Sequence, residues 1–273
     1  MKVIALAENT SVSQEFGSEH GLSLYIETQK HKLLFDTGKS RLFLENAQKI
    51  GIDLSQVDTA FISHGHYDHG GGLYAFLEVN PKASVYLHEQ AFGDYYSKRS
   101  DATEYIGLNK GLQGNPRLIL TKGFLKIDDE LSVFSDVYGR ELPSLSNKTL
   151  LIKEKNGFRE DPFEHEQNLV ICENGKKVLF AGCAHNGIVN IMQRVFEITE
   201  RYADAVIGGF HLHNPSSRKT EAPELICAIA ERLKKTGSHY YTCHCTGATA
   251  YRQLKDALGE QIEYLATSGV VVI

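Results

Sequence analysis

The sequence predicts an α/β fold, and three observations carry this prediction. Three strand-like apolar runs alternate with turns in the first 35 residues. From residue 58 onward, a strand-like run, a helical stretch and a second strand-like run follow one another. The last third of the chain then repeats a helix followed by a strand three times. Because no repeat, low-complexity tract or linker interrupts the chain, one domain spanning residues 1–273 is expected.

Local signals place the individual elements. Strands are expected at residues 2–6, 22–27, 32–35, 59–62 and 84–87, and helices around 41–50 and 72–79. Apolar stripes of helical period predict further helices at 188–198, 225–233 and 251–258, followed by strands at 205–207, 240–242 and 262–265. Pro223 suits the first turn of its helix, and Thr246 is expected to cap the helix that follows it.

The secondary structure of residues 168–180 is clear from the sequence, whereas that of residues 91–122 is not. Asn174-Gly175 separates the apolar runs 168–172 and 177–180, and this pair is typical of a two-residue hairpin turn with positive φ at both positions. Residues 91–122 show no sustained period, although they are rich in tyrosine and glycine. This long segment is interpreted as a lid or substrate loop.

Charge and hydropathy exclude several classes of protein. The 29 basic and 34 acidic residues give a net charge of −5, and no Lys/Arg cluster is present, which argues against a nucleic-acid-binding face. No run of about eighteen apolar residues could span a membrane. Residues 1–7 lack the long apolar segment and cleavage site of a secretion signal. A cytoplasmic protein acting on a small molecule is expected, and the sequence does not indicate its oligomeric state.

The five cysteines are also informative. An odd number without a paired framework, in a chain long enough to build its own core, indicates reduced thiols. Cys172 and Cys227 lie in apolar runs and are expected to be small buried hydrophobic residues.

The strongest chemical signal is the segment Phe-Ile-Ser-His-Gly-His-Tyr-Asp-His-Gly-Gly-Gly at residues 61–72. It places four metal-capable side chains, His64, His66, Asp68 and His69, within six residues. Imidazole and carboxylate suit zinc, iron or manganese, and Gly65 permits a turn that directs two of these side chains to each of two ions. Twelve histidines could cluster by chance, but the order of ligand types after a strand favours a metal site.

Later strand ends carry further candidates. A potential ligand follows each predicted strand in this region: His64, His88, Cys183 with His185, His211 with His213, and His244 with its flanking cysteines, Cys243 and Cys245. Strands that run the same way in one sheet deliver their C-terminal ends to one edge, so these residues are expected to gather near the first motif. Because that motif cannot complete two coordination spheres alone, His244 and His185 are the first choices for additional ligands.

The remaining candidates keep two interpretations each. Cys183 is either a thiolate ligand or a buried thiol, and His165 is either a ligand or a solvated loop residue. His211, in Ile-Gly-Gly-Phe-His, is either a ligand or a proton donor. His88 is better explained as a structural residue or a pocket wall.

These residues resemble the metallo-β-lactamase superfamily. Its signature His-x-His-x-Asp-His corresponds to His64, His66, Asp68 and His69, and its preceding element to Phe35-Asp36-Thr37-Gly38. The resemblance implies an αββα sandwich over the whole chain, with a dinuclear site at one rim. It further implies that His165 corresponds to the histidine of the third motif and that His244 corresponds to the ligand of the last motif. Gly182-Cys183 occupies the place of the usual Gly-Asp, whose carboxylate bridges the two ions.

The chain departs from the pattern at Cys183, where the family has aspartate, and His185 is a candidate to take over part of the bridging role. Gly-Cys-Ala-His, Gly-Gly-Phe-His and Thr-Cys-His-Cys-Thr-Gly resemble one branch, often labelled metal-dependent hydrolases or related to a dihydropterin ribofuranosyl-aminobenzene-phosphate synthase. The position of His211 is similar to that of a proton-donating histidine in the superfamily's phosphodiesterases.

The function expected from this resemblance is hydrolysis of a phosphoester, lactone or thioester by two ions, with zinc favoured and iron or manganese possible. A bridging water with a pKa near 7 would attack, and Asp68 would orient it. The second ion and His211 would stabilise the developing oxyanion or protonate the leaving group. One alternative is a synthase acting on a phosphoribosyl substrate, with Lys98, Arg99 or Arg140 assisting. A second alternative is a metal-containing binding protein without catalysis.

Overall fold

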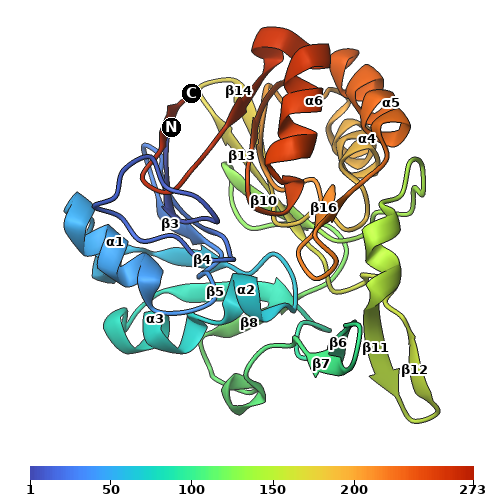
Figure 1. Cartoon of the computed structure of the whole chain (residues 1–273). Coiled ribbons are helices and arrows are strands. Elements are labelled where there is room, and N and C mark those ends of the chain that lie inside the picture. The colour runs from blue at the N-terminus through green and yellow to red at the C-terminus, as the bar shows by residue number, and fades with distance from the viewer.

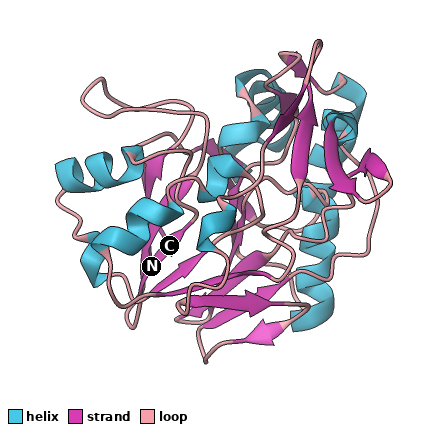
Figure 2. Cartoon of the chain, turned by 90° about the horizontal axis from the view of Figure 1, so that it is seen from below, coloured by secondary structure: helices cyan, strands magenta, loops and turns pink.

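The computed structural model describes residues 1–273. Two seven-stranded sheets pack face to face, and helices cover the outer face of each (Figure 1). The same layers are visible from below in Figure 2, where the two termini lie side by side. The predicted αββα sandwich is confirmed.

The first sheet is built by the N-terminal half and closed by the last strand. In spatial order its strands are β20 (Val270–Val272), β1 (Lys2–Ala7), β2 (Ser23–Glu27), β3 (Lys32–Phe35), β4 (Thr59–Phe61), β5 (Ser84–His88) and β8 (Leu118–Thr121). Strands β3, β4, β5 and β8 are parallel neighbours. The helices of this half are α1 (Leu42–Ile50), α2 (Tyr67–Gly70) and α3 (Leu73–Val79).

The second sheet comes from the C-terminal half. Its strands in spatial order are β19 (Ile262–Tyr264), β18 (His239–Thr242), β15 (Ala205–Gly208), β14 (Lys176–Ala181), β13 (Asn168–Glu173), β10 (Leu131–Phe134) and β9 (Leu125–Lys126). Strands β14, β15, β18 and β19 are parallel. Helices α4 (Ile188–Thr199), α5 (Pro223–Lys234) and α6 (Ala248–Leu258) cover this sheet.

The segment at 91–122 contains more regular structure than its sequence indicated. Its strands β6 (Tyr95–Lys98) and β7 (Thr103–Tyr105) join β11 (Leu150–Glu154) and β12 (Gly157–Glu160) in a four-stranded sheet. A separate hairpin pairs β16 (His213–Asn214) with β17 (Lys219–Thr220). Short 3-10 turns lie at η1 (Leu54–Gln56), η2 (Lys110–Leu112), η3 (Leu145–Thr149), η4 (His244–Thr246) and η5 (Gly259–Gln261).

Three apolar clusters hold the layers together. One, which includes Leu24 and Phe180, joins the inner faces of the two sheets. A second packs the first sheet against α1 and α3, and a third packs the second sheet against α4, α5 and α6. Each sheet is therefore buried on both faces, which explains why its central strands are continuous apolar runs rather than alternating ones. No helix is long and apolar enough to cross a bilayer.

Local predictions were mostly accurate. Asn174 (φ 50°) and Gly175 (φ 76°) form the expected turn between β13 and β14, and Pro223 opens α5. Thr246 does not cap α6, which begins after Gly247. Its hydroxyl instead accepts the Phe210 N–H at 2.9 Å, so it is already used inside the fold.

The expectation for two cysteines was wrong. Cys172 and Cys227 are exposed, because they occupy outward-facing positions on β13 and α5 although their neighbours in sequence are buried. The sequence correctly predicted a strand and a helix at these positions, but not that the two cysteine side chains lie on the solvent-facing sides of these elements.

Candidate metal centre

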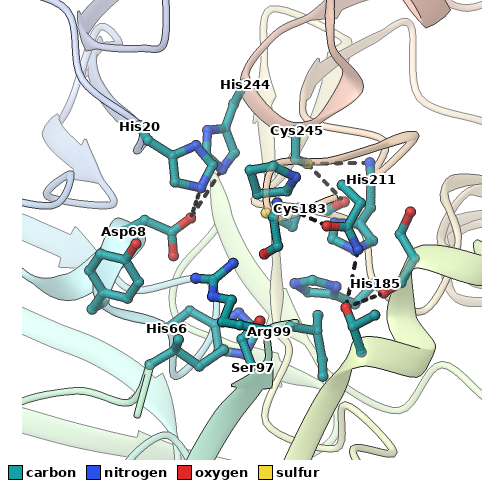
Figure 3. Close-up of a pocket in the computed structure, with 18 residues that line it drawn as sticks. His20, His66, Asp68, Ser97, Arg99, Cys183, His185, His211, His244 and Cys245 are labelled. Carbon is teal, nitrogen blue, oxygen red and sulfur yellow. Dashed lines mark hydrogen bonds and ion pairs between the residues drawn. The ribbon is translucent and has the colours of Figure 1, made fainter. Parts of the chain in front are cut away.

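The candidate site lies where parallel strands end on one rim of the sandwich. After β4, β14, β15 and β18 the chain enters short loops that together line one pocket. Figure 3 shows their side chains pointing toward a common space. The strands belong to two sheets rather than one, and the rim is shared because the sheets pack face to face.

Backbone strain is concentrated in these loops. Ala184, His211 and His244 each adopt left-handed backbone conformations, with φ of 54°, 48° and 50°. Residues other than glycine rarely take this conformation, which costs on the order of 1–3 kcal/mol each. Gly182 allows the β14 loop to lie against the first motif, since a Cβ there would collide with the Ser63 hydroxyl.

One group of side chains consists of three histidines. The ring centroids of His64, His66 and His185 lie 4.5, 4.9 and 5.1 Å apart. In all three the Nε2 atom is buried and has no hydrogen-bond partner. An unpaired buried nitrogen is costly unless a ligand binds it, so three of them together fit a binding site for a cation.

The second group lies beside the first. The Nε2 atom of His69 is 3.2 Å from that of His244 and 3.1 Å from the Cys183 sulfur. An Asp68 carboxylate oxygen lies 3.4 Å from His244 Nε2. The Cys183 sulfur is also within 4.8 Å of ligand atoms of His64 and His185, so it stands between the two groups.

Outer partners fix which nitrogen of each ring faces the pocket. The Nδ1 of His185 donates to the Asn147 amide oxygen at 3.0 Å, and the Asn147 amide group donates back to the His185 carbonyl. Asn9 holds His244 in the same two-point way, with its oxygen 2.8 Å from Nδ1. With Nδ1 carrying the proton, each Nε2 lone pair is directed inward, the arrangement usual for metal-binding histidines.

Asp36 orients two histidine rings of the first motif. Its buried carboxylate accepts the Ser63 N–H and hydroxyl, both at 2.7 Å, and the His69 Nδ1–H at 2.6 Å. Because the Ser63 hydroxyl donates to Asp36, its oxygen accepts from His64 Nδ1 at 2.9 Å. One carboxylate therefore orients two of the candidate ligands.

The electrostatics of the two groups differ. Burial, reinforced by the neighbouring histidines, lowers the pKa of His66 to about 3 and holds the pKa values of His64 and His185 well below the usual range. Burial also opposes the charged form of His69, but Asp36 and Asp68 outweigh it and raise the pKa of His69 to about 9. The three imidazoles of the first group are therefore neutral and able to bind a cation. The second group lies beside the negative charges of Asp36 and Asp68, which attract a cation.

His211 lies at the pocket side of the first group. Its ring centroid is 4.2 Å from that of His185, and both of its ring nitrogens are buried without a partner. Its backbone N–H donates to the Cys245 sulfur at 3.2 Å, which ties the His211 loop to the His244 loop.

His165 is placed differently from the other predicted ligands. Its Nδ1 accepts the Gly65 N–H at 2.9 Å, and its Nε2 lies 3.0 Å from an Asp161 carboxylate oxygen. Both nitrogens are engaged, so in the structure His165 supports the tight turn at Gly65 rather than offering a lone pair to the two groups.

The donor set fits metal ions. Imidazole, thiolate and carboxylate are the ligands that zinc and other borderline transition ions prefer. The second group alone provides four such side chains: Asp68, His69, Cys183 and His244. The fit is carried by the buried, unpaired Nε2 atoms and by their oriented partners.

Comparison with known proteins decides the family. A family model described as the metallo-beta-lactamase superfamily matches residues 17–232. The chain belongs to this superfamily.

Several superfamily relatives are similar over nearly the whole chain. One from Methanocaldococcus jannaschii, named 7,8-dihydropterin-6-methyl-4-(beta-D-ribofuranosyl)-aminobenzene-5'-phosphate synthase, is 28% identical over 99% of this chain and 96% of its own. An uncharacterized protein of the same organism is 27% identical over 91% of this chain and 92% of its own. A solved structure described as a metal-dependent hydrolase of the beta-lactamase superfamily matches with a TM-score of 0.84 and 29% identity, covering 100% and 99% of the two chains.

Some site residues of this superfamily member were not found from its sequence. His20 is one of them: it places Nε2 3.2 Å from Asp68 and lines the pocket. Cys245, one of the cysteines that flank His244 in the sequence, lines the pocket too and contacts the His211 loop. Asn9 lies in an irregular segment and Asn147 in the short 3-10 turn η3, and neither segment carries a periodic signal. By contrast, of the three basic residues considered for substrate contacts, only Arg99 lines the pocket; Lys98 and Arg140 do not, and neither does His88.

Glu8 anchors the last superfamily motif. One oxygen of this fully buried carboxylate accepts the His244 N–H at 2.6 Å and the Tyr264 hydroxyl at 2.7 Å. We expect Glu8→Ala to weaken binding of one metal ion about tenfold to hundredfold, since support of the His244 loop is lost. Metal titration of the apoprotein measures this, and Tyr264→Phe, which removes only one of the two bonds, is the milder control. Unchanged affinity in Glu8→Ala would show that the loop holds its shape without the carboxylate.

Proposed function

We propose that the protein is a metal-dependent hydrolase that binds two ions, most simply zinc, and cleaves a small ester-type substrate such as a phosphoester, lactone or thioester. The observation that carries this proposal is the set of three buried imidazoles, His64, His66 and His185, whose Nε2 atoms have no partner. Five unpaired cysteines further support a reducing compartment such as the cytoplasm.

Each ion is assigned to one of the two groups. His64, His66 and His185 would hold the first, and Asp68, His69 and His244 the second, with Cys183 placed between them as a shared thiolate. His165 is left out of this set because both of its ring nitrogens are hydrogen-bonded. Two bound ions would supply Lewis acids and a water whose pKa is lowered to about 7.

Two residues of the chain would act on the reacting groups. Asp68 presents its carboxylate to the pocket, held by His20, and would accept a hydrogen bond from the attacking water. His211 has a buried ring with two free nitrogens on the pocket wall and would donate a proton to the leaving group. Both groups lie in one pocket, as a reaction across a single bond requires.

We expect His211→Ala to retain two ions per chain and to lower kcat by about a hundredfold to ten-thousandfold, the usual contribution of general acid catalysis. The loss is expected to shrink for substrates with good leaving groups, which need no protonation. Metal analysis combined with kcat across a series of leaving groups measures both effects. His239→Ala is the control, because that histidine pairs with Glu263 on the surface. Loss of an ion in His211→Ala would make this residue a ligand instead.

A screen of the metal-loaded protein against phosphodiesters, phosphomonoesters, lactones and thioesters tests the reaction class. Turnover of one class that disappears on removal of metal supports the proposal. No turnover in a fully loaded sample would favour a binding protein.

A second candidate is a synthase acting on a phosphoribosyl substrate. It is favoured by the similarity, 28% identity over 99% of the chain, to a protein named as such a synthase. Product analysis with phosphoribosyl pyrophosphate and an aromatic amine or acid acceptor separates the two candidates. Formation of a joined product, rather than simple hydrolysis, would select the synthase.

A further inference from the structure

The pocket contains one positively charged side chain, Arg99, that has no role in the proposed reaction. Of the eighteen residues that line it, Arg99 is the single lysine or arginine, and Asp68 is the single carboxylate. Asp68 is committed to the second group of metal-binding side chains. The guanidinium of Arg99 therefore has no counter-charge on the pocket side.

Arg99 reaches the pocket because of strand alternation. In β6, Tyr95 and Ser97 are buried, whereas Lys98 is exposed on the opposite face. Arg99 follows at the end of the strand on the same side as Ser97, and its N–H donates to the Ala102 carbonyl at 2.7 Å to close the hairpin. Figure 3 shows its side chain extending toward the space between Asp68 and His185.

The guanidinium is held in a defined orientation. Its Nε donates to the Glu104 carboxylate at 2.9 Å across the β6–β7 hairpin, and its side chain is only 26% exposed. Neither terminal nitrogen makes a hydrogen bond within the protein, and these two donors together can bind a carboxylate or phosphate end on, through two parallel hydrogen bonds. The Ser97 hydroxyl, in a residue only 3% exposed, lines the same pocket and adds a further donor.

We propose that Arg99 and Ser97 form a binding subsite for an anionic group of the substrate, a carboxylate or a phosphate, located away from the bond that is cleaved. The inference rests on the proposed function, because it takes the metal centre as the place where the scissile bond lies. It narrows the substrate class to small molecules with a cleavable bond at one end and an anionic group at the other. It also gives the 91–122 segment a role in selecting the substrate.

Three small acids of matched length test this subsite directly. Butyrate, succinate and 3-phosphonopropionate share one carboxylate end and differ at the other, which is a methyl, a carboxylate or a phosphonate. Calorimetric titration of the metal-loaded protein is expected to show succinate, 3-phosphonopropionate or both binding about tenfold to hundredfold more tightly than butyrate, as for a charge-assisted hydrogen bond. The tighter of the two identifies the anion that the subsite prefers.

Arg99→Gln is expected to abolish this preference, whereas Lys98→Gln, which removes the same charge from the adjacent outward-facing position, is expected to keep it. No preference in the wild-type protein, or an undiminished one in Arg99→Gln, would overturn the inference. The titration requires no turnover, so it is separable from the proposed function. If the substrate screen fails while the preference persists, hydrolysis is rejected and the subsite stands; the reverse result rejects the subsite alone.

Discussion

Replacing His66 with alanine is expected to reduce the metal content from two ions per chain to one. The loss follows because His66 supplies one of only three buried, unpaired Nε2 atoms in the first group. Turnover should fall by more than the roughly hundredfold to thousandfold that removal of a single charge-stabilising group costs, since a whole ion is lost with the side chain. Metal analysis after dialysis and steady-state kinetics measure the two effects.

His88→Ala is the matched control for this variant. His88 and His66 are equally buried, at 4% exposure each, but His88 does not line the pocket, and its Nδ1 accepts the Gln90 N–H. The control should therefore keep both ions, even if it loses some stability. Two ions in His66→Ala, or unchanged turnover in a sample holding one, would contradict the assignment of the first group.

Replacing Asp36 is expected to lower both the stability of the protein and its affinity for metal. Asp36→Ala is expected to lower the free energy of unfolding by about 3–5 kcal/mol, because it leaves the Ser63 and His69 donors without an acceptor in a fully buried position. Metal affinity should also fall by at least about tenfold to hundredfold, since the orientation of His69 is lost. Chemical denaturation of the apoprotein and metal titration measure these changes independently.

Asp36→Asn separates orientation from charge. Asn tolerates the positive φ of 60° at this position and keeps one acceptor oxygen, so most of the stability should survive. The negative charge that raises the pKa of His69 is removed, and metal affinity should still decrease. Asp58→Asn, at a half-exposed carboxylate on the surface, should change neither property. Equal metal affinity in Asp36→Asn and wild type would show that geometry alone accounts for the role of Asp36.

The fold was largely predictable because it depends on periodicity. Apolar runs and helical stripes located the central strands and helices to within about three residues at each end, and more closely at Lys32–Phe35 and Ile188–Thr199. The turn at Asn174-Gly175 was equally clear, because few residues accept positive φ. The β6–β7 hairpin was missed because β7 is exposed throughout, and β6 is a four-residue strand whose buried face consists of only Tyr95 and Ser97, too little to give a recognisable apolar period.

The site was predictable only in part. That ligand-type residues follow strands β4, β14, β15 and β18 could be read from the sequence, but whether a ring nitrogen is free could not. His165 and His185 were both candidates, and the difference arises from partners that are distant in sequence: Gly65 engages one ring, whereas Asn147 leaves the inward nitrogen of the other unpaired. His20 enters the pocket from an irregular segment, so tertiary packing alone reveals it. Arg99 was one of three basic candidates, and only the fold shows that it, rather than Lys98 or Arg140, reaches the pocket.

Anomalous diffraction from a crystal of the zinc-loaded protein, recorded on both sides of the zinc absorption edge, tests the central claim most directly. We expect two peaks at the rim, one bounded by His64, His66 and His185 and the other by Asp68, His69 and His244, with the Cys183 sulfur between them. No peak in this pocket, or ions bound only elsewhere on the chain, would contradict the account.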